Sequence, residues 1–102
     1  MTNIPKYFAW GCTGLTSLTI GNSVSTINEY AFEECTNLKT INFPSNTKII
    51  KQYVFHSCIS LRSFAIPDGV ESIYENAFEN CEKLENVTIS KNMHQPLCAP
   101  IF

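Results

Sequence analysis

Residues 66–89 read Ile66-Pro-Asp-Gly-Val-Glu-Ser-Ile-Tyr-Glu-Asn-Ala-Phe-Glu-Asn-Cys-Glu-Lys-Leu-Glu-Asn-Val-Thr-Ile89, and this stretch is the clearest copy of a unit that recurs along the chain. The unit returns every 23 residues without an insertion. A fixed period of this length is the sequence signature of a repeat architecture. The stretch therefore predicts a stack of similar structural units.

Seven positions of the unit are apolar in almost every copy. The three strictest columns are Cys12/Cys35/Cys58/Cys81, Leu15/Leu38/Leu61/Leu84 and Ile4/Ile27/Ile50/Ile73. The aromatic column contains Phe32, Phe55 and Phe78, but the first copy has Ala9 there and Phe8 beside it, as if a large and a small residue were exchanged. Because one repeat cannot bury these side chains alone, we expect stacked repeats to bury them as continuous columns.

The frame Leu-x-x-Leu-x-Leu/Ile and the period of 23 lie within the pattern of leucine-rich repeats. The segments Ile-Pro-x-x-Val-x-x-Ile and Ala-Phe-x-x-Cys give the chain a more particular form, which resembles the BspA-like leucine-rich repeat family over roughly residues 4–93. Three positions depart from the pattern: Gly21 and Ser90 stand in place of proline, and Thr47 stands in place of valine.

These observations predict an α/β repeat solenoid, a leucine-rich repeat fold in a single domain over residues 1–102. The four repeats are expected at about 4–26, 27–49, 50–72 and 73–95. Each would contribute one strand to a short parallel sheet on the concave side, at 15–20, 38–43, 61–66 and 84–89. Each would also contribute a short helical turn on the convex side, such as residues 28–34 or 75–80, and Asn28 is a good helix N-cap.

The two ends of the array look weakly capped. After Met93 the period stops, because Pro96 stands where isoleucine is expected. The tail, residues 94–102, is either a C-terminal cap, formed by Leu97, Ile101 and Phe102, or an unstructured end. Since solenoids need capped ends for solubility, weak caps favour either excision from a longer array or end-to-end self-association.

Composition excludes several classes of function. The net charge is −2 and the pI about 5.6, which argues against a nucleic-acid binder with a basic face. No apolar run approaches the roughly 18 residues that suggest a membrane span. The N-terminus shows no secretory hydrophobic region. Local charge changes sign along the chain, from basic in residues 35–67 to acidic in residues 68–85. Either these residues are simply solvated, or the gradient orients a partner or a head-to-tail neighbour.

The five cysteines admit three interpretations. The four that form a column are expected to be small buried thiols. A disulfide within the column is the second interpretation, disfavoured because equivalent side chains of a stack point in parallel. A zinc site is the third, and a spacing of 23 residues is not a zinc pattern. Cys98 in the tail would be a reactive thiol or an intermolecular linker.

No catalytic, metal or cofactor site is expected. His56 aligns with Glu33 and Glu79, so it should be exposed. His56, Ser57 and Cys58 are not expected to form a catalytic nucleophile, because Cys58 should be buried. The carboxylates form no calcium loop, and the glycines form no phosphate loop. The sequence thus predicts a protein that is not an enzyme.

The strand surface is the candidate binding site. Outward positions on the predicted strands are small, mostly polar and uncharged, and Lys39, Arg62 and Glu85 lie at the edge of the sheet. The candidate binding residues are Ser17, Thr19, Thr40, Asn42, Ser63, Ala65, Asn86, Thr88, Lys39 and Arg62. Solenoids bind extended partners on such surfaces. The alternative is that these residues are simply strand formers that face water.

Resemblance to the BspA-like family implies a microbial surface or secreted protein that attaches to host or matrix proteins. The leading hypothesis is therefore a non-enzymatic module for protein binding or adhesion. The alternative is a structural subunit that stacks end to end into oligomers or filaments. Trp10 would either cap the first repeat or contact a partner, and Asn86-Val-Thr88 is a glycosylation pattern that would obstruct the concave side.

Overall fold

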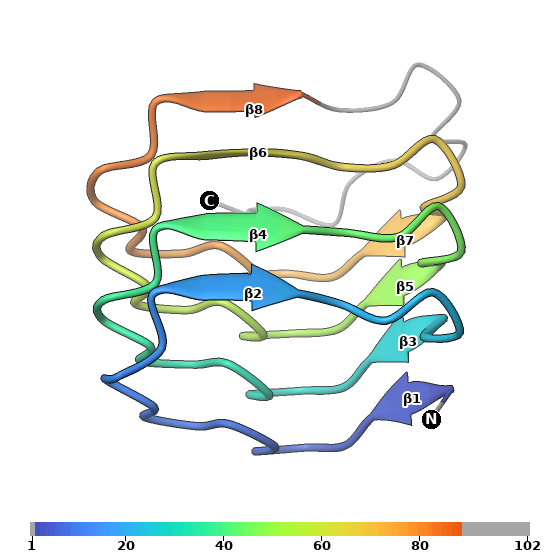
Figure 1. Ribbon diagram of the computed structural model, residues 1–102, viewed down its shortest axis with the longest axis horizontal. Coiled ribbons are helices and arrows are strands. Elements are labelled where there is room, and N and C mark those ends of the chain that lie inside the picture. The colour runs from blue at the N-terminus through green and yellow to red at the C-terminus, as the bar shows by residue number, and fades with distance from the viewer. Residues whose placement is uncertain (1, 89–102) are drawn as a thin grey trace.

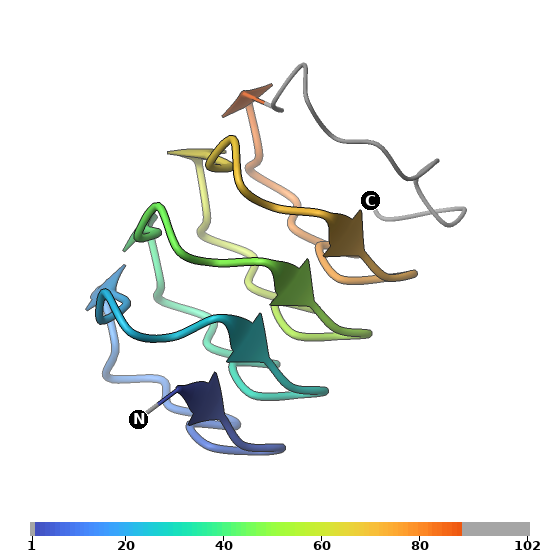
Figure 2. The ribbon, with the colours of Figure 1, turned by 90° about the vertical axis from the view of Figure 1, so that its right-hand side faces the viewer.

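The structure is a computed structural model that describes residues 2–88. The chain coils through four rungs, and each rung supplies one strand to each of two parallel sheets (Figure 1). Figure 2 shows the two sheets as opposite sides of the coil. The predicted solenoid with parallel strands is therefore confirmed. The tail at 94–102 lies outside the described residues.

The first sheet contains the strands predicted from the leucine frame, in the order β2-β4-β6-β8. Its members are β2 (Ser17–Thr19), β4 (Thr40–Asn42), β6 (Ser63–Ala65) and β8 (Asn86–Thr88). Equivalent residues pair across each rung, as in Ser17↔Thr40 and Leu18↔Ile41. The strands have three residues each, half of the predicted six. Central residues such as Ile41 and Phe64 are buried, and their neighbours are exposed.

A second sheet, in the order β1-β3-β5-β7, was not predicted. Its strands are β1 (Asn3–Ile4), β3 (Thr26–Ile27), β5 (Ile49–Ile50) and β7 (Ser72–Ile73). They lie in the segments expected as extended connectors. Two residues are too few to show the alternation that marks a strand in sequence. The isoleucine column of the repeat is the buried side of this sheet.

The predicted helical turns are wrong, because residues 2–88 contain no helix. In the turn that follows β3, alternate N–H groups donate to the next rung: Phe32 donates to Val54 O at 2.9 Å and Glu34 to His56 O at 2.9 Å. The amide of Ala31 instead donates within the rung, to Asn28 O at 3.3 Å. A helix would direct all these groups along its own axis. Asn28 is not a helix cap; its side chain donates to Ile4 O of the preceding rung at 2.9 Å.

Two backbone positions in every turn adopt the left-handed conformation. One column comprises Tyr7, Tyr30, Tyr53 and Asn76, and the other comprises Gly11, Glu34, Ser57 and Asn80, all with φ between 59° and 68°. This conformation costs an L-residue about 1–2 kcal/mol. In this conformation the peptide groups point toward the neighbouring rungs. The hydrogen bonds that they form there offset the conformational cost.

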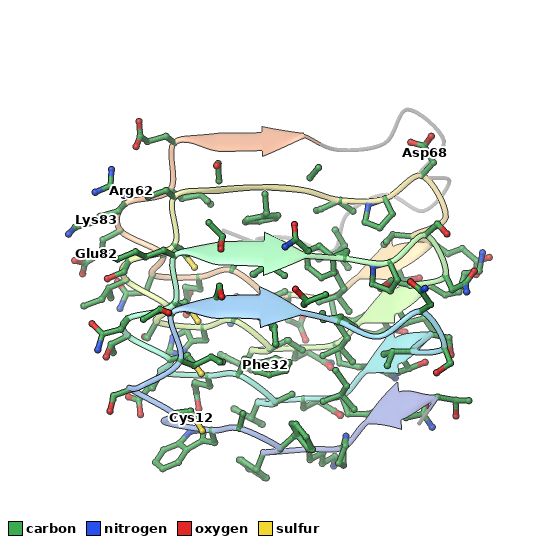
Figure 3. The ribbon with its side chains drawn as sticks, viewed as in Figure 1. Cys12, Phe32, Arg62, Asp68, Glu82 and Lys83 are labelled. Atoms are coloured by element: carbon green, nitrogen blue, oxygen red, sulfur yellow. The ribbon has the colours of Figure 1, made fainter. Side chains whose placement is uncertain are left out.

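The core lies between the two sheets, where Phe32 is seen in Figure 3. Phe32, Phe55 and Phe78 stack with ring centroids 5.5 and 5.3 Å apart, and all are at most 1% exposed. The predicted burial of Cys35, Phe55 and Leu61 is confirmed, since each is 0% exposed. Thr47, in the valine column, is also fully buried, and its hydroxyl has no hydrogen-bond partner. A buried polar group without a partner costs about 1–3 kcal/mol.

Replacing Phe55 by alanine should lower the free energy of unfolding by about 3–5 kcal/mol, as is usual for a buried phenylalanine. Phe55 has a ring stacked on each side, so its removal leaves a cavity that neither neighbour can fill. Denaturant unfolding of the two proteins measures the difference. Phe8→Ala is the matched control, because Phe8 is 54% exposed and its truncation should cost far less. Equal losses for the two variants would contradict the stacked core.

Candidate functional site

The outward side of the first sheet presents a regular array of small side chains, which we call the strand face. It is defined by the outward positions of β2, β4 and β6: Ser17, Thr19, Thr40, Asn42, Ser63 and Ala65, all of which are exposed. The parallel register aligns Ser17, Thr40 and Ser63 in one column. Asn86 and Thr88 of β8 continue the register beside Ser63 and Ala65.

The edge of the strand face carries the basic residues expected there. Lys39 and Arg62 immediately precede β4 and β6 and are exposed. Arg62 projects at the turn edge of the sheet (Figure 3). Its Nη1 lies 3.7 Å from Glu85 Oε1, and both side chains are more than 60% exposed. An ion pair this exposed contributes little to stability, so Arg62 can exchange its partner for an external carboxylate at small cost.

The chemistry of the strand face is that of hydroxyl and amide groups on a rigid backbone. Hydroxyls both donate and accept hydrogen bonds, and an amide does the same through separate atoms. The positions repeat at the spacing of neighbouring strands, about 4.8 Å. Such an array suits an extended polar partner that can make the same contact at several rungs.

The cysteine column is a set of free thiols. Cys12, Cys35, Cys58 and Cys81 form no disulfide, and no cluster of metal-ligating side chains occurs in residues 2–88. Cys58 Sγ donates to Phe32 O at 3.2 Å, and Cys35 and Cys81 make equivalent bonds. Loss of hydration by burial raises the pKa of Cys35 to about 11 and that of Cys81 to about 12, and it raises the pKa of Cys58 as well. Cys12 departs from the prediction because it is exposed, since no rung precedes it among the described residues.

A tyrosine ladder that the sequence analysis missed runs along the turns. Tyr7 and Tyr30 stack with centroids 5.1 Å apart, and Tyr30 and Tyr53 stack at 5.2 Å. Asn76 continues the column and donates from Nδ2 to the Tyr53 hydroxyl at 2.8 Å. The recurrence of tyrosine at a spacing of 23 residues was the available signal.

A charged ladder lies beside the tyrosines. His56 Nδ1 is 2.7 Å from Glu33 Oε2, and His56 Nε2 is 3.1 Å from Glu79 Oε1. His56 thus links three rungs, and it is half-buried where the sequence predicted an exposed position. Trp10 extends the ladder by donating from Nε1 to Glu33 Oε1 at 2.9 Å, while its side chain stays 51% exposed at the N-terminal end.

The geometry around His56 does not form a nucleophile. Ser57 Oγ lies 3.4 Å from His56 Nδ1, the nitrogen that already contacts Glu33. In a catalytic triad the acid and the hydroxyl occupy different ring nitrogens. Here His56 Nε2 is taken by Glu79 instead. The cluster is a network of side-chain contacts that links neighbouring rungs.

Comparison with known proteins agrees with this geometry. The family model described as "BspA type Leucine rich repeat region (6 copies)" matches residues 2–96. The chain belongs to the BspA-type leucine-rich repeat family. The resemblance seen in the sequence is thus confirmed. No curated protein matches the chain.

Solved structures of other leucine-rich repeat proteins share the fold. A leucine-rich repeat protein of T. pallidum superposes with a TM-score of 0.90 at 26% identity, over 96% of this chain and 45% of that one. One from Bacteroides ovatus gives 0.79 at 28% identity, over 96% and 31%. A leucine rich cell surface protein from Faecalibacterium prausnitzii gives 0.72 at 26% identity, over 81% and 21%. This chain spans less than half the length of each.

At pH 8 one thiol of the folded BspA-type chain should react rapidly with an aromatic disulfide reagent, in a Cys98→Ser background. Cys12 is exposed, whereas burial raises the pKa of Cys35 and Cys81 well above 8, so little thiolate forms there. Four thiols should react after denaturation, and Cys12→Ser should abolish the rapid phase. A denatured count below four, or a rapid phase that survives Cys12→Ser, would contradict the assignment.

Proposed function

We propose that the chain is a non-enzymatic module that binds a polypeptide partner on the strand face. The observation that carries the proposal is the uncharged, exposed array of hydroxyl and amide side chains, held in register by the parallel sheet. Family membership supports it, since leucine-rich repeat proteins are in general binding modules.

Rigidity favours binding at this surface. The side chains of the strand face are short, so little rotamer entropy is lost when a partner orders them. The backbone beneath them is fixed by inter-rung hydrogen bonds, such as Ile20 N to Asn42 O at 3.0 Å. A preorganised surface avoids part of the cost of association. An extended segment with polar side chains would contact Ser17, Thr40 and Ser63 in succession.

The kind of partner follows from the charges at the edge. Lys39 and Arg62 are exposed cations at the edge of the strand face. The best-fitting partner therefore has a polar segment that contacts the strand face and carboxylates beside that segment that contact these cations. Adhesion to a host or matrix protein is consistent with this chemistry. The solved relative from F. prausnitzii is described as a cell surface protein, which supports a surface location as part of the proposal.

A second candidate function is self-association through the ends of the solenoid. The observation that favours it is the cluster of exposed aromatic side chains on the first rung, comprising Tyr7, Phe8 and Trp10. Contact between copies would bury that surface and build oligomers or filaments.

The double substitution Thr40→Arg and Asn42→Arg tests the strand face. Both side chains are exposed, so the variant should fold with an unchanged melting temperature. Two long cations in the middle of the array should weaken binding to an immobilised extracellular-matrix preparation at least tenfold, measured by surface plasmon resonance. Thr13→Arg with Ser45→Arg is the matched control, because it adds equal charge at exposed positions outside the strand face. Equal binding by the two variants would rule out the strand face.

A further inference from the structure

The central strands of the strand face cannot take a partner by adding a strand to the sheet. β4 and β6 are hydrogen-bonded to a neighbouring strand on each side, in the order β2-β4-β6-β8 (Figure 1). Addition of a strand needs an edge strand whose backbone N–H and C=O groups are unpaired. A partner that lies over β4 and β6 is therefore recognised by the exposed side chains of these strands.

An extended partner contacts the largest number of these side chains when it crosses the strands. Within one strand only two exposed residues face such a partner, for example Thr40 and Asn42 of β4. Across the strands, the parallel register aligns Ser17, Thr40 and Ser63 in one column. A chain that runs at right angles to the strands meets one residue of this column at every rung, which is about every 4.8 Å.

The spacing of the rungs favours one conformation of such a partner. A β-strand presents side chains on the same side every two residues, about 6.7 Å, which falls between one rung and two. A polyproline II helix repeats every three residues at a rise of about 3.1 Å per residue, so its period is about 9.3 Å. Two rungs span about 9.6 Å. A polyproline II helix therefore meets equivalent side chains at every second rung, whereas a β-strand loses register within one repeat.

The side chains of the strand face complement the backbone of a polyproline II helix. That helix has no internal hydrogen bonds, so its carbonyl oxygens are free to accept hydrogen bonds from another molecule. The hydroxyls of Ser17, Thr40 and Ser63 can donate such bonds, and the side-chain amide of Asn42 can donate as well. All four residues are short and exposed, so a backbone can approach the sheet closely. The polar groups of the partner are then its own backbone carbonyls.

A column of charged residues runs beside the strand face in the same register. The amide of Arg62 donates to Lys39 O at 3.3 Å and the amide of Glu85 donates to Arg62 O at 2.7 Å, so these three residues lie on successive rungs. Lys39 makes no ion pair within residues 2–88, and the pair of Arg62 with Glu85 is open to solvent. Lys39 and Glu85 are two rungs apart, about 9.6 Å. Residues i and i+3 of a polyproline II helix are separated by nearly the same distance, about 9.3 Å.

We propose that the partner of the strand face is a polyproline II segment that crosses the strands and carries an acidic residue three positions from a basic one. The acidic residue contacts Lys39 and Arg62, and the basic residue contacts Glu85. This inference rests on the proposed function and specifies the partner. From β2 to β8 the sheet spans about 14 Å, room for about four to five residues of such a segment. Because a polyproline II segment is already extended when free, it loses little conformational freedom on binding.

Two synthetic peptides of equal charge test the conformation of the partner on the full chain. The proline peptide has Asp-Pro-Pro-Lys at its centre between flanking prolines, and the flexible peptide has glycine or serine in place of every proline. Each is labelled with fluorescein and titrated with the protein at low ionic strength, and fluorescence anisotropy measures the Kd. The proline peptide should bind at least tenfold more tightly. Equal affinities, or no binding of the proline peptide at millimolar protein, would overturn the proposal.

Reversal of the charge at Glu85 tests how the partner is aligned. The variant Glu85→Lys should bind a peptide with Asp-Pro-Pro-Asp at its centre more tightly than the proline peptide, which is the reverse of the original preference. Glu85 is more than 60% exposed, so the melting temperature should not change. Glu82→Lys is the matched control, because it changes the charge equally at an exposed position outside the strand face, and it should keep the original preference. The same preference in both variants would refute the alignment.

The same double variant separates this proposal from binding at the strand face in general. Thr40→Arg with Asn42→Arg should weaken binding of both the proline peptide and the matrix preparation. If it weakens binding of the matrix preparation while the proline and flexible peptides bind the original chain equally, the strand face remains the site and the polyproline II partner is wrong. Binding of the proline peptide that survives the double substitution would place that partner elsewhere and refute the inference.

Discussion

The structure depends on burial that neighbouring rungs provide for one another. A rung of 23 residues is a closed loop of chain with apolar side chains pointing inward, and it has no second layer of its own to cover them. Stacking supplies the cover: each phenylalanine, leucine and isoleucine packs on its equivalent one rung away, as Phe55 does on Phe32 and Phe78. Backbone hydrogen bonds between rungs follow from the same register. This mutual burial accounts for the regularity of the interior.

The chemistry of the strand face follows from its position on the stack. The strand face is a side of the coil, where inward and outward positions alternate and the exposed positions are free to be small and polar, as at Thr40 and Ser63. The strand face therefore offers hydrogen-bonding groups to a partner.

The sequence was sufficient for the architecture and for the register of the strand face, because an uninterrupted period aligns equivalent residues such as Ser17 and Thr40 by itself. It was insufficient for local backbone geometry. Residues 28–34 have a helical composition, yet Tyr30 and Glu34 are left-handed because their turn bonds to the next rung, an interaction that local propensity does not contain. The second sheet was missed because two-residue strands show no alternation. His56 was expected to be exposed. Its contacts with Glu33 and Glu79 could have been predicted only by asking which side chains of one column meet between neighbouring rungs.

Amide hydrogen exchange, followed residue by residue, tests the central claim most directly. Phe32, Lys51 and Phe55 donate their amide hydrogens to a neighbouring rung, at 2.9, 3.0 and 2.8 Å, and lie between covered columns. Their amides should exchange among the slowest in the chain, through opening of the whole stack. Amides of exposed turn residues such as Ser45 should exchange far faster. If Phe32 and Phe55 exchanged as rapidly as Ser45, the rungs would not be holding one another together.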